Sequence, residues 1–479
     1  MDTNVNMEKL VSLAKRRGFV FQGSEIYGGL AGTWDYGPYG VELKENIKRL
    51  WWDIFVHGRQ DMYGVDAAIL MNQEVWKASG HTGAGFADPL VECQKCRRRF
   101  RADHIGWTDN AGKVVHREGV KCPECSGELG GVQQFNLMFK TFVGPTSHEE
   151  YQPEGSEHDR NDNGSYSVTD LNPERHYITY DPDAISYLRP ETAQGMFVNF
   201  KNVLDSLHPQ LPFGMAQIGK AFRNEIAPRD FIFRTREFEQ MEIEYFVREE
   251  NWKESFNEWK ELMLDWMYML GLPAERVHEL EVPEDERAHY SKRTVDFEFD
   301  FPFGRKELYG LAYRTDFDLK NHMEHTGVDL HYTDPATGEK LVPHVIEPTF
   351  GLDRTVLAVL ASAYDEDELG GEKRTVLRLP AAIAPVRAAV FPLLKNKPEL
   401  VEKAREVFNS LKKEMRVEFD DNGNIGKRYR RQDEIGTPYC VTIDFETLED
   451  GTVTVRNRDT GAQERVSIAE LASHIQEQF

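Results

Sequence analysis

The stretch Phe222–Phe246, FRNEIAPRDFIFRTREFEQMEIEYF, decides which fold the chain is expected to adopt. Pro228 and Asp230 break strands while aromatic and β-branched residues flank them, so the stretch predicts two strands joined by a loop. Successive side chains of a strand point to opposite faces, so the even-numbered residues from Phe238 to Glu244 share one polar face opposite an apolar one. A solvated face is the ordinary interpretation of such a hairpin. Its mixture of Arg, Glu and an aromatic ring also suits a flat, charged, nitrogen-rich ligand.

The composition is that of a globular protein of about two to four domains, with 479 residues of which 40% are hydrophobic. The net charge of −23 argues against a surface coated with nucleic-acid-binding bases, although local basic patches remain compatible with it. The polar N-terminus resembles no signal peptide, and no apolar run is long enough to span a bilayer. A cytoplasmic location is therefore expected.

Four of the five cysteines form two CxxC pairs, Cys93/Cys96 and Cys122/Cys125, with 25 residues between the pairs. Two such knuckles can surround one tetrahedral zinc ion with four thiolates, which leaves no open position for catalysis. The spacer slightly exceeds the common range, and free thiols are the alternative. The sequence predicts a structural zinc site.

The other periodic segments predict a mixture of helices and strands. Pro38 suits the first turn of a long helix, whose apolar stripe fits a core or an interface equally well. Glu191 is expected in the first turn of another helix. The expected elements are helices over 8–20, 252–271 and 351–363, a core-facing aromatic stripe on the second of these, strands over 294–303 and 341–350, and a mobile loop over 144–170.

The C-terminal part reads as a separate α/β domain. Residues 365–373 are expected to be a charged linker, and Ser467 with Glu470 is expected to form a capping box before a final helix. The segment 423–431 places four bases around one aromatic ring, which suits nucleobase stacking, while a solvated basic helix face is the alternative.

Together these stretches resemble the class II aminoacyl-tRNA synthetases, and specifically the homodimeric type of glycyl-tRNA synthetase. The Gly-rich segment 23–40 and the helix after Pro38 are similar to the first motif of that family, the dimer element. Residues 222–225 with 238–242 resemble the second motif, and Gly351-Leu352-Asp353-Arg354 resembles the third. Further similar stretches are Phe135–Phe139, Arg189–Thr192, Tyr290–Lys292, Arg314–Leu319 and Glu347-Pro348.

The resemblance implies an α+β catalytic domain with an antiparallel sheet over 1–89 and 176–368. It also implies an inserted zinc-ribbon-like subdomain with a flexible loop over 90–175, and a C-terminal α/β anticodon-binding domain over 376–479. The implied reaction has two steps: glycine and ATP give glycyl-adenylate and diphosphate, and the glycyl group then passes to the 3′-terminal ribose of tRNA(Gly). The implied partners are tRNA(Gly), glycine, ATP, Mg²⁺ and a second copy of the chain.

For ATP, the resemblance implies that the catalytic residues Arg223 and Arg354 bind the α- and γ-phosphates, since a guanidinium fork suits phosphate oxygens. Phe238 would stack on adenine, Glu225 would accept from its amino group, and Glu307 would hold Mg²⁺. The expected ATP-binding residues are Arg223, Asn224, Glu225, Phe233, Arg234, Thr235, Arg236, Glu237, Phe238, Glu307, Leu308, Gly351, Leu352, Asp353 and Arg354.

For glycine, Glu191, Glu242 and Glu347 are expected around the ammonium group, and strand parity favours Glu242 over Glu239. Arg314 could meet the carboxylate, and Thr349 replaces the usual Ser of the family, which is expected to be harmless. The expected glycine-binding residues are Arg101, Glu191, Phe238, Glu239, Gln240, Met241, Glu242, Arg314, Glu347, Pro348, Thr349, Phe350 and Gly351. The expected tRNA-binding residues are Lys427, Arg428, Tyr429, Arg430 and Arg431.

Two alternatives compete with this interpretation. One is a class II ligase for a different small amino acid, against which three glutamates in a small pocket argue. The other is a non-catalytic nucleic-acid-binding relative, such as the synthetase-derived accessory subunit of a mitochondrial DNA polymerase. That relative would be free to lose Arg223, Glu225, Glu307 and Arg354, all of which are present.

Overall fold

The computed structural model describes residues 6–105, 120–144, 148–149, 178–179, 184–288 and 290–477. They fall into two compact units. Unit 1 comprises residues 1–67, 191–220 and 227–479, and unit 2 comprises 68–190 and 221–226. The mobile loop expected over 144–170 lies almost entirely outside the described residues.

Unit 1 begins with α1 (Met7–Arg16), a ribbon of β1 (Val20–Gln22) and β2 (Trp34–Tyr36), and α2 (Pro38–Trp52). Pro38 occupies the first turn of α2, as predicted. Gly40 allows this turn to lie against the ribbon, since an added Cβ would stand 1.8 Å from the carbonyl oxygen of Phe19. The apolar stripe of α2 belongs to the core: Ile47 and Trp51 are fully buried.

The centre of unit 1 is a seven-stranded sheet with the strand order β14-β15-β16-β19-β13-β12-β3. The pairs from β14 to β13 are antiparallel, and β12 and β3 are parallel. The strands are β14 (Val277–Glu281), β15 (Arg293–Phe301), β16 (Gly304–Thr315), β19 (His344–Gly351), β13 (Glu237–Val247), β12 (Phe213–Phe222) and β3 (Met62–Gly64).

Of the two strands predicted in the opening stretch, the second is present as β13, but the first is wrong, because the strand β12 lies before the stretch and reaches only its first residue. β12 ends at Phe222, so Arg223 and Glu225 follow the strand and are not part of it. Phe231–Phe233 do not form a strand; they are buried in the main core. The physical reason is that Asp230 and Phe231 both have positive φ angles, which turn the chain.

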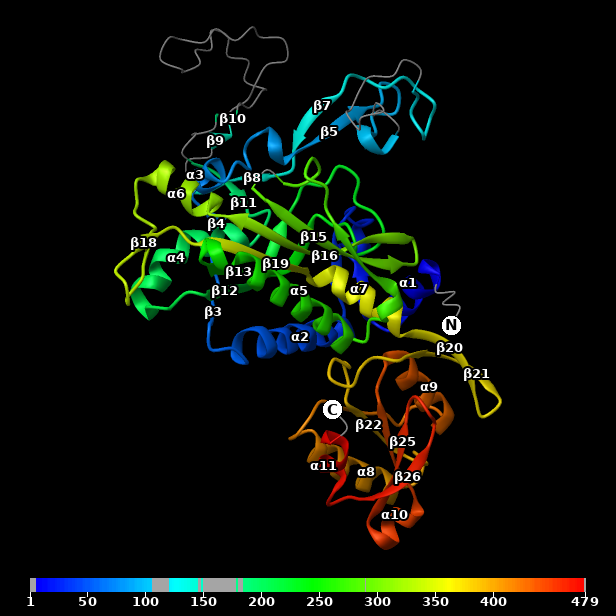
Figure 1. The fold of residues 1–479 in the computed structure, drawn as a ribbon. Helices are drawn as coiled ribbons and strands as arrows, with labels where there is room; N and C mark the ends of the chain where they lie inside the picture. Colours follow the sequence, from blue (N-terminus) through cyan, green and yellow to red (C-terminus); the bar gives the residue numbers. More distant parts are fainter. Residues whose placement is uncertain are drawn as a thin grey trace. The chain divides into compact units, whose positions relative to one another are not determined.

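Different helices pack on the two faces of the sheet. One face packs on α2, α5 (Trp252–Met269) and α7 (Leu352–Ala363), seen beside the sheet in Figure 1, to form the main core. As predicted, Trp259 and Trp266 of α5 are fully buried there. The other face meets α4 (Ala193–Leu207) and α6 (Phe317–Thr326) in a second apolar cluster. Glu191 precedes α4, outside the first turn predicted for it.

The C-terminal part of unit 1 has its own five-stranded sheet, with the order β23-β22-β24-β25-β26, and a separate core. Its strands are β22 (Ala388–Pro392), β23 (Val417–Phe419), β24 (Tyr439–Ile443), β25 (Thr452–Asn457) and β26 (Gln463–Ser467). Its helices are α8 (Pro398–Leu411), α9 (Ile425–Ile435), α10 (Phe445–Asp450) and α11 (Leu471–Gln476).

Two local predictions for this region were wrong. Residues 365–373 are not a linker: β20 (Tyr364–Leu369) and β21 (Glu372–Leu377) form a hairpin there, in which acidic residues face basic ones, such as Asp367 opposite Arg374. Ser467 ends β26 and does not cap a helix, because α11 begins at Leu471. In unit 1, β17 (Tyr332–Thr333) and β18 (Lys340–Leu341) form a further short ribbon outside the two large sheets.

Unit 2 is larger than the predicted insertion, because the strands on either side of the cysteine-rich segment pack with it. One sheet has the order β6-β5-β7 and another the order β4-β11-β8. The elements are β4 (Leu70–Met71), α3 (Gln73–Ala78), β5 (Ala87–Glu92), β6 (Arg99–Arg101), β7 (Gln133–Asn136), β8 (Phe139–Phe142), β9 (His148–Glu149), β10 (Ile178–Thr179) and β11 (Ile185–Leu188).

Candidate active site

The polar face of the large sheet carries a group of acidic side chains around a single arginine. Strand alternation sends the odd-numbered residues of β13 into the main core and the even-numbered ones to the opposite face. We call this group the carboxylate cluster. Its members are Glu191, Glu242, Glu244, Asp318 and Glu347, with Arg314 between them.

Arg314 is 1% exposed and is held on two sides. Its Nε and Nη2 donate to the two carboxylate oxygens of Asp318, each at 2.8 Å, and its Nη1 donates to Glu347 Oε1 at 2.7 Å. The ring of Tyr290 lies against the guanidinium, 3.9 Å from Cζ to the ring centroid. The fork geometry fixes Asp318 and Glu347 relative to one another.

Glu242 is fixed by neighbours from three segments. Its Oε2 accepts from the backbone N–H of Thr192 at 3.0 Å and from the Thr192 hydroxyl, and its Oε1 accepts from Gln240 Nε2 at 2.7 Å. Thr349 lies opposite Glu242 in the β13–β19 register. The parity prediction that Glu242, and not Glu239, lies on this face of β13 is confirmed.

Gln194 connects Glu191 to the cluster. Its Nε2 donates to Glu191 Oε1 at 3.2 Å and to Asp318 Oδ1 at 2.9 Å, and His322 Nε2 lies 2.9 Å from its Oε1. Burial lowers the pKa of His322, although Asp318 opposes this shift. A neutral imidazole adds no cation to the cluster.

The cluster holds more negative charge than its one guanidinium can balance. Burial raises the pKa of Glu347 to about 8; Arg314 opposes this shift, and Glu242 and Glu191 add to it. A buried site with surplus carboxylates is suited to a small cation such as an ammonium group. Gln194, Glu244, Asp318 and His322 were not predicted as site residues; the alternation of β13 would have signalled Glu244.

Glu239, on the other side of β13, belongs to a different network. Lys44 Nζ lies 2.9 Å from Glu239 Oε2 and 3.4 Å from Asp353 Oδ1. Asp353 Oδ2 accepts the backbone N–H of Glu239 at 2.7 Å, and the Tyr36 hydroxyl donates to Asp353. Burial alone would raise the pKa of Glu239, but Lys44 and Lys48 outweigh it and lower that pKa. This network joins β2, α2, β13 and the first turn of α7.

Arg354, in the first turn of α7, lies beside acidic residues of β15 and β16. Its guanidinium is 3.3 Å from the Glu307 carboxylate and lies over the ring of Phe233. Glu307 faces Glu298 across the two strands. Burial, together with Glu307 and Glu298, raises the pKa of Asp296 to about 7, against the effect of Arg354. Asp296 and Glu298 were missed, although the alternation of acids with phenylalanines over 296–301 signals an acidic strand face.

Several predicted ligand residues have side chains in the core instead of at a site. Met241, Leu308, Phe350 and Leu352 are at most 1% exposed and belong to the main core, so only their backbone atoms could contact a ligand. Phe238 is half-buried at the start of β13. Arg236 donates to the carbonyl of Ala31 at 2.8 Å.

The predicted residues of unit 2 form their own contacts. Arg223 Nε donates to the carbonyl of Pro190 at 3.1 Å, and its guanidinium lies over the ring of Phe86. Glu225 is 9% exposed. Arg101 is paired with Asp88 and with Asp103, the latter through two hydrogen bonds of 3.2 and 2.9 Å.

The four cysteines of the CxxC pairs converge in unit 2. The Sγ atoms of Cys93, Cys96, Cys122 and Cys125 all lie within 4.8 Å of one another. Gly127 makes room for this approach, since an added Cβ would stand 3.2 Å from Cys93 Sγ and 3.3 Å from Cys125 Sγ. The arrangement fits one tetrahedral metal ion.

Residues 425–431 of the basic segment belong to α9, with Asn424 as its N-cap. Arg428 is 1% exposed and donates to backbone carbonyls, including that of Gly423 at 2.8 Å. The Tyr429 hydroxyl is 2.7 Å from Thr442 Oγ1, while Lys427 is exposed. The alternative of a basic helix thus describes the backbone correctly, and only part of the segment faces outward.

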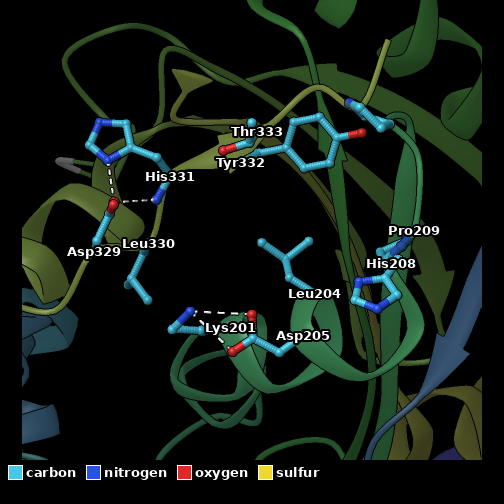
Figure 2. A pocket seen from close by; sticks show the side chains of 11 residues that line it. Lys201, Leu204, Asp205, His208, Pro209, Asp329, Leu330, His331, Tyr332 and Thr333 are labelled. Carbon is cyan, nitrogen blue, oxygen red and sulfur yellow. Dashed lines mark hydrogen bonds and ion pairs between the residues drawn. The ribbon is translucent and has the colours of Figure 1, made fainter. Parts of the chain in front are cut away.

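A separate hollow of about 430 Å³ lies between α4 and residues 329–335 (Figure 2). Its charged side chains pair with one another. Lys201 lies 3.0 Å from Asp205, and His331 Nδ1 lies 2.6 Å from Asp329 Oδ1. This hollow therefore shows no charge surplus like that of the carboxylate cluster.

Comparison with known proteins assigns two regions of the chain to families. Residues 177–363 match the tRNA synthetase class II core domain (G, H, P, S and T), and residues 387–478 match the anticodon binding domain. The chain is 48% identical to the glycine–tRNA ligase of Caldanaerobacter subterraneus subsp. tengcongensis and 49% identical to that of Clostridium acetobutylicum, over 100% of each protein. It is 49% identical to that of Bacillus thuringiensis subsp. konkukian, over 99% of both chains. Among the described residues, no helix is long and apolar enough to cross a membrane.

Proposed function

Because the chain belongs to the glycine–tRNA ligase family, we propose that it activates glycine with ATP to glycyl-adenylate and transfers the glycyl group to the 3′-terminal ribose of tRNA(Gly). The observation that carries this proposal is the carboxylate cluster, whose surplus negative charge suits the ammonium group of an amino acid. The cluster lies on the polar face of a sheet within the class II core match.

The roles within the cluster follow from its contacts. Glu191, Glu242 and Glu347 bind the glycine ammonium, each already oriented by a neighbouring hydrogen bond. Arg314 is buried and engaged with Asp318 and Glu347, which supports a role in holding Glu347 more than a contact to the glycine carboxylate. The methyl group of Thr349 narrows the pocket beside Glu242 and so disfavours larger amino acids.

For ATP, the proposed roles are those that the family resemblance implies. Arg223 binds the α-phosphate and Arg354 the γ-phosphate, because fixed cations stabilise the charge that develops on phosphate oxygens. Phe238 stacks on adenine, and Glu225 accepts from its amino group. A class II core uses ATP with Mg²⁺, and the acidic group of Asp296, Glu298 and Glu307 supplies the oxygen ligands that this ion prefers.

Three further assignments concern the rest of the chain. Cys93, Cys96, Cys122 and Cys125 bind a structural Zn²⁺ ion. The chain acts as a homodimer; Ile26 and Tyr27, 90% and 87% exposed in the segment before α2, support a contact there. The anticodon-binding domain contacts tRNA through α9, with Lys427 as its exposed base. A cytoplasmic location fits this activity.

Glycine-dependent exchange of diphosphate with ATP tests the proposal directly. We expect exchange with glycine and much less with alanine or serine. Absence of exchange with glycine would support a non-catalytic relative, and faster exchange with alanine or serine would support a ligase for another small amino acid. Charging of tRNA(Gly) transcripts then tests the second step.

A further inference from the structure

Glu244 is a buried acid of the carboxylate cluster that the proposed reaction leaves without a role. Glu242 faces Thr349 and Tyr245 faces Ile346 across β13 and β19, so the continuous register sets Glu244 opposite Glu347. Side chains directly opposite each other on one face of an antiparallel pair have Cβ atoms about 4.5–5.5 Å apart. Two acids therefore face each other in the floor of the cluster.

The surroundings of Glu244 do not stabilise a charge. The residue is 0% exposed, and no described residue hydrogen-bonds to either of its carboxyl oxygens. Burial and then Glu347 raise the pKa of Glu244 well above its usual range. Arg314 of β16 opposes the shift, while Glu242 of the same strand and Asp318 of α6 add to it. An unpartnered buried carboxylate is costly, so the neutral acid is the stable form.

Glu347 has a different environment from Glu244. It accepts a hydrogen bond from Arg314, yet Glu242 and Glu191 repel its charge, and its pKa is raised to about 8. When two facing acids interact strongly, their protons belong to the pair. An arriving ammonium group would add a positive charge that favours the ionised form of the pair.

We propose that Glu244 and Glu347 hold a shared, displaceable proton in the ligand-free pocket, and that binding of an ammonium group expels it to solvent. The inference rests on the proposed binding of glycine by this cluster. One proton leaves as one ammonium enters, so the net charge of the pocket is unchanged. Glu244 is then a positioning residue that sets the charge of Glu347 and does not itself touch the substrate.

Proton release is measured by calorimetric titration of the full-length protein with glycine, in two buffers of different ionisation enthalpy, between pH 6 and 8.5. For the wild type we expect a buffer-dependent heat corresponding to release of up to one proton. Glycine should bind more weakly as the pH falls below about 8, by up to tenfold per pH unit.

The variant Glu244→Gln replaces the neutral acid by a neutral amide that can donate to Glu347. We expect proton release to fall and the pH dependence of glycine binding to flatten, while Glu254→Gln, at an exposed position of α5, behaves as the wild type. Unchanged proton release in Glu244→Gln would overturn the proposal. Glycine binding without any buffer dependence in the wild type would overturn it too, whereas no glycine binding at all would overturn the proposed function itself.

Thermal unfolding of Glu244→Gln gives a readout that does not depend on ligand. An acid whose pKa is raised by folding contributes stability that is present below its unfolded pKa and is lost as the pH rises toward its folded pKa. The melting temperature of Glu244→Gln relative to the wild type should therefore increase from pH 5 to pH 8. A constant difference across this range would show that Glu244 does not retain a proton in the folded protein.

Discussion

Two buried charge clusters of unit 1 combine carboxylate and guanidinium groups in different proportions. In the C-terminal domain, Asp433 is 0% exposed and lies between Arg374, at 3.1 Å, and Arg456, at 2.9 Å. Arg374 is also bound by Asp367 on its other side, through hydrogen bonds of 2.6 and 2.8 Å. In the carboxylate cluster, five acids surround one guanidinium, that of Arg314.

This difference in charge balance distinguishes a cluster that stabilises the fold from a cluster that can bind a ligand. Around Asp433, charges of both signs satisfy one another, and each contact helps to hold β21 and β25 against α9. Around Arg314, negative charge remains after its hydrogen bonds to Asp318 and Glu347 are made, and Glu244 has no hydrogen bond from the described residues. Proteins rarely tolerate such a surplus unless protons or a ligand compensate for it.

The largest expected effect is that of Asp433→Asn. The substitution removes the negative charge that Arg374 and Arg456 share, and leaves their guanidinium groups close together in a buried place. We expect a loss of about 3–5 kcal/mol of stability. Denaturant unfolding measures it, with Glu449→Gln, at an exposed position of α10, as the control. Glycine-dependent exchange under conditions where the variant is folded should stay close to that of the wild type.

For Glu242→Gln we expect the reverse of Asp433→Asn, namely retained stability and a loss of activity. The substitution removes one of the surplus negative charges, and the amide oxygen can still accept from the Thr192 N–H, so stability should not fall. Loss of a buried contact to ammonium should cost about 2–4 kcal/mol of glycine activation, roughly 30- to 1,000-fold in kcat/KM. Diphosphate exchange at varied glycine concentration measures it. Strong destabilisation with an unchanged KM for glycine would place Glu242 with the structural clusters.

Lys44→Met tests the network in which Lys44 pairs with Glu239 and Asp353. It leaves Glu239 and Asp353 partly unpaired beside Phe238 and Arg354, the residues proposed to bind ATP. We expect the KM for ATP to rise by about tenfold, or 1.4 kcal/mol, with little change in the KM for glycine. Lys48→Met is the matched control, because Lys48 reaches Glu239 but not Asp353. Equal rises in both KM values would argue for a general loss of folding.

Much of the fold could be predicted because its signals are local. Pro38 begins α2, the aromatic stripe of α5 is buried, and Gly351 precedes α7, as the sequence indicated. The errors arose where pairing between distant segments decides the structure. Residues 365–373 are polar enough for a linker, yet they form a hairpin whose Arg374 is held by Asp433 of the distant helix α9.

The same distinction applies to the site. Alternation along β13 was enough to place Glu242 on the polar face and Met241 in the core. It could not reveal that Gln194 joins Glu191 to Asp318, since these contacts depend on how α4 and α6 pack on the sheet. Nor could it reveal which arginines are structural: Arg314 was expected to bind glycine and Arg428 to bind tRNA, yet both are 1% exposed and bound by neighbouring groups of the protein.

The smallest expected effect is that of a substitution at Lys427, and a substitution at the neighbouring Arg428 should have a different consequence. Lys427 is exposed at the start of α9, so Lys427→Ala should only weaken an electrostatic contact with tRNA. We expect the KM for tRNA(Gly) to rise about two- to fivefold, and by more at low salt. Diphosphate exchange should be unchanged. Arg428→Ala should instead lower the melting temperature, because it removes the donor to the buried carbonyl of Pro392. If Arg428→Ala proved fully stable and impaired only tRNA charging, Arg428 would contact tRNA despite its burial.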